Sequence, residues 1–373
     1  MRGADAGRLM IPALLVGLVG LVALIALAVM STREALASLL TATLFLLGLP
    51  VGAMTLLMIH LLTGGKWGDA VRAPLRAMTA TLPLALILLL PVLAGAGLVF
   101  PWAGADPSSL PQVVRFKLAW LNLPFFTLRF VVCAVAWLAL AWAVLGWTRE
   151  PAARGRGAAI GLIVNALAVT FFTIDWMLSL EPAFYSTIYG MLEAAGGATG
   201  AYALALLIVT LARPIEATPG GSEGVALSED AANMLFSFVL MWAYLAFMQW
   251  LIVWAADLPH EIHWYLLRVE GGWLYVLWLL IGLEFAVPFA GFLVRDLKRS
   301  RRGILALGAA VLAGHLVDVW WRVRPPLSDG VLGSIAFDLA ALVGAGGLWL
   351  SLFLFVLTRP ERLTYWRGRL RHG

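Results

Sequence analysis

Ten long apolar segments, separated by short polar stretches, dominate the hydrophobic pattern of this chain. Each has about 20 residues or more and few charges, which is enough for an α-helix to cross the hydrocarbon core of a bilayer. The short alternating segments of a membrane β-barrel are not seen. The pattern predicts an all-α polytopic membrane protein, built as one integral membrane domain over residues 1–373. The expected spans are 10–30, 35–62, 78–100, 124–147, 158–178, 195–211, 232–256, 272–294, 304–321 and 331–358.

Composition agrees with this class, since 62% of the residues are hydrophobic, 13% are charged and the mean hydropathy is +0.92. Many of the 17 Trp residues lie near the ends of the apolar segments, where aromatic belts form at membrane interfaces. The first segment could instead be the core of a signal peptide, because Arg8 precedes it and Ala35-Leu36-Ala37 resembles a cleavage site. Its length favours a helix that is retained.

The net charge of +5 comes from basic residues in the loops and does not indicate a nucleic-acid partner. If the spans alternate in direction, most of the 26 Lys and Arg residues fall on the side of the two termini. By the positive-inside rule both termini are expected to be cytoplasmic. The loop at residues 213–231 is acidic and goes against this trend, but Asp and Glu contribute little to orientation.

Three polar-aromatic loops then lie on the outer face, at residues 101–123, 179–194 and 257–271. The stretch at residues 174–190 is the most unusual, because it combines a carboxylate at a helix end, a turn that stops at proline and several hydroxyls. We expect this outer surface to dock partners or to cover a ligand pocket. The candidate residues are Trp176, Glu181, Tyr185, Tyr189, His260, Glu261, His263, Trp264 and Arg268.

Ionisable residues inside the apolar segments are candidates for function, because each costs roughly 2.5–3.5 kcal/mol at the middle of a membrane helix. His315 and Asp318 share a helix face, and Asp318 is also four residues before Arg322. A histidine beside a carboxylate suits proton transfer, since histidine titrates near neutral pH. The candidate proton-carrying residues are His60, Arg129, Asp175, Glu284, His315, Asp318 and Asp338.

Structural roles are the alternative for these residues. Arg129 could neutralise a neighbouring acid, and Asp318 with Arg322 could form a salt bridge at the interface. A haem needs two facing axial ligands, and only His60 and His315 lie in spans. A metal bound by His260, Glu261 and His263 would lack convincing further ligands. With a single cysteine, Cys133, no cofactor and no metal is expected in this chain.

Five motifs are similar to one membrane-protein family. They are LTGGKWGDAVRAPLRA (62–77), KLAWLNLPFF (117–126), IDWMLSLEPAFYSTIYG (174–190), WAYLAFMQWLIVWAADLPHEIHWYLLR (242–268) and GGWLYV (271–276). In sequence and order they resemble the ActF-type membrane subunit of bacterial alternative complex III, a quinol:electron-acceptor oxidoreductase. That subunit is related to the NrfD-like, polysulfide-reductase-type membrane proteins. The family pattern has a second acidic residue where this chain has His260, so a role that needs a carboxylate there does not carry over.

The resemblance implies two four-helix bundles with peripheral first and last helices in the bacterial cytoplasmic membrane. The implied partners are a second NrfD-like subunit that binds quinol, periplasmic iron–sulfur and cytochrome c subunits, and in some assemblies a terminal oxidase. The implied function is that of a cofactor-free subunit that anchors the complex and provides a proton pathway, with Asp175 at its outer mouth. Two alternatives stay open. This chain could bind the quinol itself, or it could be a secondary transporter with a site in mid-membrane.

Overall fold

The computed structural model describes residues 3–146, 151–212 and 222–359, and in these residues it is all-helical. Ten of the helical segments there are long and apolar enough to cross a membrane, which confirms the predicted class. The last residue of the fourth expected span, at position 147, lies outside the described residues. The principal helices are α1 (Gly3–Ala28), α2 (Thr32–Thr63), α3 (Lys66–Thr79), α8 (Leu123–Gly146), α9 (Pro151–Trp176), α10 (Tyr189–Ala212), α11 (Ser222–Ala256), α16 (Arg301–Val323) and α17 (Val331–Thr358).

Two spans are interrupted rather than continuous. The third consists of α3, α4 (Leu82–Leu88) and α5 (Leu90–Ala94), followed by α6 (Ala96–Val99); prolines stand at the starts of α4 and α5, where no backbone N–H is needed. The eighth consists of α13 (Trp273–Leu280), a π-helical turn η3 (Ile281–Ala286) and α14 (Val287–Leu293). Such π-helical turns often occur at functional sites.

Short elements join the spans. They are η1 (Pro107–Ser109), α7 (Gln112–Arg115), η2 (Leu178–Leu180), α12 (Pro259–Leu266), α15 (Arg295–Arg299) and η4 (Pro325–Leu327). Two spans begin six or more residues before their expected starts. The third span begins at Lys66, because the polar stretch expected as a loop is the amphipathic helix α3. The sixth begins at Tyr189 rather than at residue 195, and this brings Glu193 into the helix.

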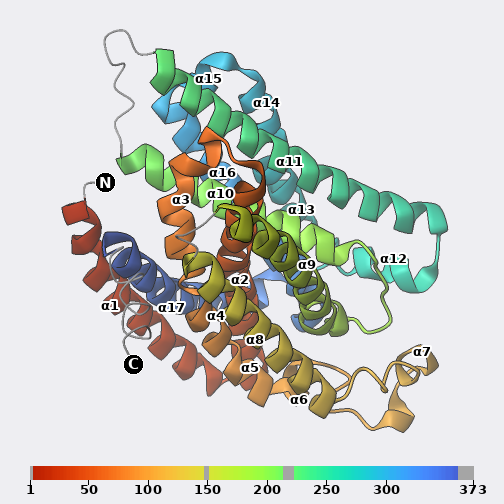
Figure 1. The fold of residues 1–373 in the computed structure, drawn as a ribbon. Coiled ribbons are helices and arrows are strands. Elements are labelled where there is room, and N and C mark those ends of the chain that lie inside the picture. The colour runs from red at the N-terminus through yellow and green to blue at the C-terminus, as the bar shows by residue number, and fades with distance from the viewer. Residues whose placement is uncertain (1–2, 147–150, 213–221, 360–373) are drawn as a thin grey trace.

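The helices form two four-helix bundles (Figure 1). One contains α2, the third span, α8 and α9, and the other contains α10, α11, the eighth span and α16. The bundles meet mainly where α2 packs against α10. Gly52 makes this close approach possible, because a Cβ there would overlap the backbone at Gly197 of α10. Small residues commonly let membrane helices approach each other in this way.

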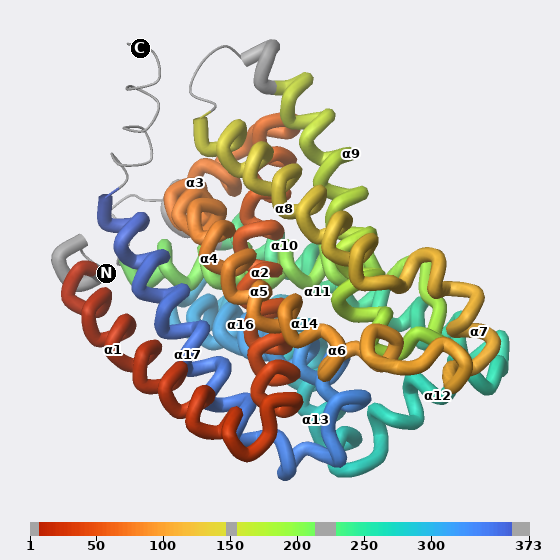
Figure 2. Tube along the Cα trace, turned by 90° about the horizontal axis from the view of Figure 1, so that it is seen from below, coloured from red at the N-terminus to blue at the C-terminus, as the bar shows by residue number. Residues whose placement is uncertain are grey.

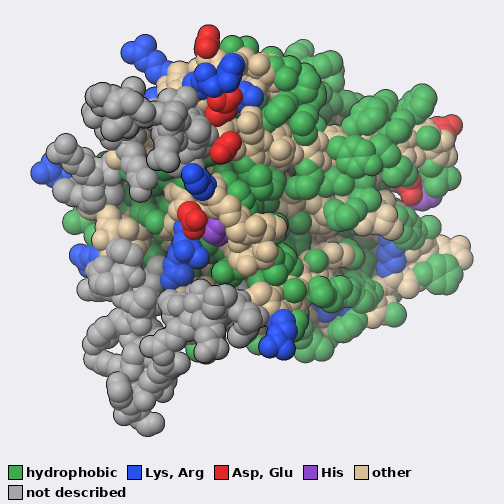
Figure 3. Space-filling view, turned by 45° about the horizontal axis from the view of Figure 1, so that its top comes forward, with side chains coloured by type: hydrophobic (Ala, Val, Ile, Leu, Met, Phe, Trp, Pro, Cys, Tyr) green, Lys and Arg blue, Asp and Glu red, His purple; other side chains and the backbone are tan. Residues whose placement is uncertain are grey.

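The first and last spans lie side by side at the edge of the molecule, as the ribbon and the tube both show (Figures 1 and 2). Gly17 and Gly20 of α1 face Gly344 and Gly347 of α17, and a Cβ at any of them would meet backbone of the other helix at 2.8 Å or less. Hydrophobic side chains cover much of the visible surface in Figure 3, whereas charged ones gather mainly toward its top and left. The apolar belt fits contact with a lipid bilayer.

Candidate functional site

A buried ion cluster joins α16 to α10. The Arg322 guanidinium donates from Nη2 to Oδ2 of Asp318 at 2.7 Å, and the same nitrogen lies 2.8 Å from Oε2 of Glu193. Its Nε lies 3.1 Å from both Asp318 oxygens, and the indole of Trp242 points at Oδ2 from 3.4 Å. Two carboxylates therefore share one cation where water is scarce, so the cluster has the capacity to take up a proton.

Glu193 is not among the residues predicted from the sequence, although its carboxylate is part of this cluster. The apolar pattern predicts that the sixth span begins at residue 195, which leaves Glu193 in a loop. A signal existed, since Glu193 lies one turn into the helical segment that begins at Tyr189 and is followed by glycine and alanine that give a side chain room. The pair of Asp318 and Arg322, by contrast, follows directly from the spacing of four residues.

His315 lies one turn before Asp318 and is completely buried. Its ring packs on Gly196 and Gly200 of α10, and the ring of Phe45 is 5.6 Å away between centroids. Within the described part of the chain, neither ring nitrogen has a hydrogen-bond partner. His315 and Asp318 therefore share a face, as predicted, but the histidine is not bonded to the carboxylate.

Glu284 is also completely buried, in the π-helical turn of the eighth span. Neither carboxyl oxygen has a hydrogen-bond partner among the described residues. The side chain lies against Gly314, the residue next to His315. The structure thus brings three predicted residues, Glu284, His315 and Asp318, together with Glu193 and Arg322, and we call these five residues the α16 cluster.

Asp175 and Arg129 form a separate pair between α9 and α8. Arg129 donates to both carboxylate oxygens of Asp175, at 2.6 and 2.8 Å, and Trp120 donates to one of them at 3.1 Å. The guanidinium also lies over the rings of Trp120 and Phe125. Arg129 therefore neutralises a neighbouring acid, as the structural alternative predicted, and both carboxylate oxygens of Asp175 are occupied.

Asp338 belongs to a third cluster, which joins α17 to α2 and α16. Arg324 donates to Asp338 at 2.8 Å and to Glu34 at 2.5 Å. Ser38 and Trp320 also donate to the Asp338 carboxylate, at 2.6 and 2.9 Å. Like Asp175, this carboxylate has partners on both oxygens, and it does not join the α16 cluster.

His60 lies at the C-terminal end of α2 and is also apart from the other candidates. Its Nε2 is 3.0 Å from the carbonyl oxygen of Gly65 and 3.7 Å from Oδ1 of Asp69. The ring packs edge-on against Trp67 and fills the space beside Gly68. These contacts fix the start of α3 against the end of α2.

Two of the loops predicted to lie on the outer face, at residues 179–194 and 257–271, are tied together through Arg268, which is almost completely buried; we call them the outer loops after that prediction. Its Nη1 lies 2.6 Å from Oε1 of Glu181 and donates to the carbonyl of Trp264, whose ring lies beneath the guanidinium. Nη2 donates to the carbonyl of Arg322 at 2.6 Å, which links the outer loops to α16. Burial raises the pKa of Glu181 and lowers that of Arg268, and the attraction between the two charges opposes both shifts.

A hollow of about 280 Å³ opens beside this tie and is lined by Glu181, Phe184, His260 and His263. Tyr185 packs edge-on against His260, and the Lys117 ammonium lies 3.5 Å from the centre of the Tyr185 ring. Burial lowers the pKa of Lys117. The outer loops thus place two imidazoles and one carboxyl around a single opening. Glu261 stands in the first turn of α12, outside the residues that line the hollow.

Two other aromatic candidates do not reach this hollow. Trp176 is fully buried in an aromatic cluster with Phe100, Phe126 and Phe172. Tyr189 is buried beneath Trp264, which it contacts edge-on. Both residues therefore serve the packing of the bundle.

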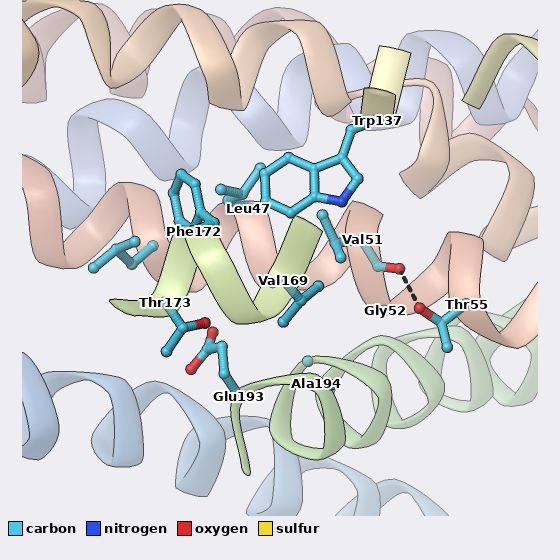
Figure 4. Close-up of a pocket in the computed structure, with 13 residues that line it drawn as sticks. Leu47, Val51, Gly52, Thr55, Trp137, Val169, Phe172, Thr173, Glu193 and Ala194 are labelled. Atoms are coloured by element: carbon cyan, nitrogen blue, oxygen red, sulfur yellow. Dashed lines mark hydrogen bonds between the residues drawn. The ribbon is translucent and has the colours of Figure 1, made fainter. Parts of the chain in front are cut away.

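A small cavity lies between α2, α9 and α10 (Figure 4), close to the α16 cluster. Glu193 and Thr173 line one part of it, and Thr55 and Trp137 line another. Trp137 donates to Oδ1 of Asn165 at 2.9 Å, and Asn165 donates to the hydroxyl of Thr55 at 2.8 Å. Polar groups thus continue from Glu193 into the junction of the two bundles.

Over the described ranges, no group of three or more His, Cys, Asp and Glu side chains has an arrangement that could hold a metal ion. His60 and His315 lie on different helices and each is enclosed by its own neighbours. In the α16 cluster, the carboxyl oxygens of Glu284 and the ring nitrogens of His315 have no hydrogen-bond partner among the described residues, whereas Asp175 and Asp338 are held in ion pairs.

Comparison with known proteins adds one local likeness. No protein-family model matches the chain. A segment is 37% identical over 102 residues to a heme A synthase of Caulobacter sp. (strain K31), which is 24% of this chain and 28% of that enzyme. The match spans well under two thirds of the relative's length and establishes no family. The chain is therefore a polytopic helical membrane protein with a buried charged cluster in its second bundle.

Proposed function

We propose that this chain is an integral membrane subunit of a quinol-oxidising respiratory complex in the bacterial cytoplasmic membrane, and that it carries protons through the α16 cluster. In this proposal it has no redox centre of its own. The observation that carries it is the state of Glu284 and His315: both are completely buried, and their titratable atoms have no partner in the described chain. A group that only stabilises a fold is normally paired.

The chemistry of the cluster suits this role. A buried carboxyl without a cation holds a proton at lower cost than it holds a charge, and so Glu284 can act as a proton donor. Glu193 and Asp318 share the charge of Arg322, which leaves one net negative charge to receive a proton. The imidazole of His315 lies one turn before Asp318 along α16, and both of its ring nitrogens lack a hydrogen-bond partner among the described residues, so that the ring is available to relay a proton.

The outer loops support the choice of partners. Arg268 connects the loop at Glu181 to α12 and to the end of α16, so a protein that docks on these loops would be coupled mechanically to the cluster. Two of the five motifs similar to the alternative complex III subunit, at residues 174–190 and 242–268, include the loop at Glu181 and α12. We propose that periplasmic iron–sulfur and cytochrome c subunits dock there, beside a second, quinol-binding membrane subunit.

The test is quinol oxidation by the native complex after reconstitution into liposomes. Glu284→Gln replaces the titratable carboxyl by an amide that cannot carry the proton, and it breaks no observed hydrogen bond. We expect assembly and bound haem to stay unchanged, while protons translocated per electron fall. Glu270→Gln, which makes the same chemical change at an exposed position, is the control. Purification without haem-bearing or iron–sulfur partners would overturn the respiratory assignment, and an unchanged proton-to-electron ratio would overturn the proton route.

A second function, a quinol site within this chain, rests on the hollow at the outer face. His260, His263 and Glu181 offer hydrogen-bond donors and acceptors beside the apolar ring of Phe184. A photoreactive quinone analogue should then label residues of α12 or of the loop after η2. Labelling confined to another subunit would exclude this alternative.

A further inference from the structure

Gly48 of α2 keeps a small space open between two members of the α16 cluster. A Cβ placed on Gly48 would lie 3.5 Å from Nε2 of His315 and 3.8 Å from Oε1 of Glu193. The third neighbour, the Cα of Gly197, would be 3.7 Å away. Nε2 and Oε1 therefore face the same side of α2 across a glycine, and the space between them is large enough for one methyl group.

This space adjoins the cavity at the junction of the two bundles (Figure 4). Gly48, Glu193 and Gly197 all line that cavity, together with Thr173. The room it offers to the centre of a water molecule is about 20 Å³. A single water needs roughly 10–15 Å³ by this measure, so the cavity fits one water and excludes larger ligands.

Three polar groups stand around the space over Gly48 and the adjoining cavity. Nε2 of His315 and the hydroxyl of Thr173 are completely buried, and neither has a partner among the described residues. Figure 4 shows the Thr173 hydroxyl and the Glu193 carboxyl pointing toward one another. A buried water typically makes about three hydrogen bonds, and Nε2 of His315, the Thr173 hydroxyl and Oε1 of Glu193 can supply that number.

We propose that one water molecule binds over Gly48 and bridges Nε2 of His315 to the Glu193 carboxylate, with Thr173 as its third partner. Its role rests on the proposed proton route. When His315 is protonated, Nε2 gives its proton to the water as the water gives one to Glu193. One N–H and one O–H bond break, two O–H bonds form, and the positive charge of the ring and the negative charge of the carboxylate are both neutralised. Without the water the two groups have no hydrogen-bonded connection.

Gly48→Ala tests the site with little disturbance, because its nearest contacts would be ordinary van der Waals distances. The methyl group would occupy the space of the water. Gly48→Ser would put a hydroxyl there that can replace the water. Gly346→Ala on α17 is the matched control, since a Cβ at Gly346 meets nothing within 4 Å.

The deciding measurement is a structure of the purified protein in nanodiscs, with its native partners, at a resolution that shows ordered water. Density between His315 and Glu193 in the wild type and in Gly346→Ala, but not in Gly48→Ala, supports the site. A wild-type structure without this density overturns it, whatever the variants show. Proton-coupled turnover gives a separate answer. It should fall severalfold in Gly48→Ala and recover in Gly48→Ser. If the density behaves as expected and turnover does not change, the water site stands and the proton route fails.

Discussion

Glu284 packs directly on the backbone of Gly314, so that the π-helical turn of the eighth span and α16 touch without an intervening side chain. A Cβ on Gly314 would lie 2.7 Å from the backbone nitrogen of Glu284 and 2.8 Å from its Cα. These atoms are backbone and cannot move aside alone. The contact holds the unpaired carboxyl beside His315, and it depends on glycine at position 314.

Gly314→Ala should therefore be destabilising. Overpacking a close helix contact costs about 1–3 kcal/mol, and here it should also displace the carboxyl of Glu284. Thermal unfolding in detergent, followed by tryptophan fluorescence, measures the change. Gly333→Ala serves as the control, because a Cβ at Gly333 has no neighbour within 4 Å. Equal melting temperatures for the two variants would contradict the packing described for Gly314.

Asp318→Asn should affect stability and proton transfer together. The substitution removes a charge that accepts bonds from two Arg322 nitrogens, and hydrogen bonds to charged groups contribute about 1.5–3 kcal/mol. Glu193 still pairs with Arg322, so the protein should fold. Proton-coupled turnover of the native complex should fall, while Glu284→Gln should lower turnover with a smaller loss of stability. The proposed division of roles is wrong if Glu284→Gln is the less stable variant.

The sequence predicted the helices and the local pair but not the contacts between helices. Asp318 with Arg322 follows from spacing on one helix. The partners of Arg322 on α10 and of Arg324 on α2 depend on which faces meet, and that is set by glycines at the crossings. Glu193 shows the same limit: its charge suggests a helix boundary in the sequence, whereas in the fold Arg322 makes its burial possible.

The environment of the outer loops gives a prediction about pH. Burial raises the pKa of Glu181 above its ordinary value of 4.5, despite the attraction of Arg268. The folded protein therefore binds this proton more tightly than the unfolded chain does. The stabilisation is complete below pH 4.5 and is lost as the pH rises through the raised pKa.

Glu181→Gln should remove this contribution. As the pH is raised from 4.5, the melting temperature of the wild type should fall relative to that of the variant. The fall should end once the pH has passed the folded-state pKa of Glu181. Asp329→Asn in the loop before α17 is the control for a general effect of losing one carboxylate on this face. If the melting temperatures of the wild type and of Glu181→Gln change in parallel with pH across this range, Glu181 has the same pKa in the folded and unfolded protein.

Asp175 gives the sharpest contrast between a structural and a proton-carrying carboxylate. Asp175→Asn leaves Arg129 buried with a neutral neighbour, and breaking a buried pair typically costs 3–5 kcal/mol. Because of this loss of stability, less of the Asp175→Asn variant should assemble into the native complex. Removing both charges, in Arg129→Met with Asp175→Asn, should cost less than the single change, because no buried charge is left without its partner. Unfolding of Asp175→Asn, Arg129→Met and the double variant completes the cycle.

The same cycle decides the role of Asp175 in proton transfer. If Asp175 is the outer mouth of a proton route, the double variant should assemble and still have a lowered proton-to-electron ratio. The closed ion pair predicts the opposite: turnover and ratio in the assembled double variant should match those of the wild type, since both carboxylate oxygens are bonded to Arg129 and Trp120. We expect the second result, which would confine the proton-carrying groups to the α16 cluster.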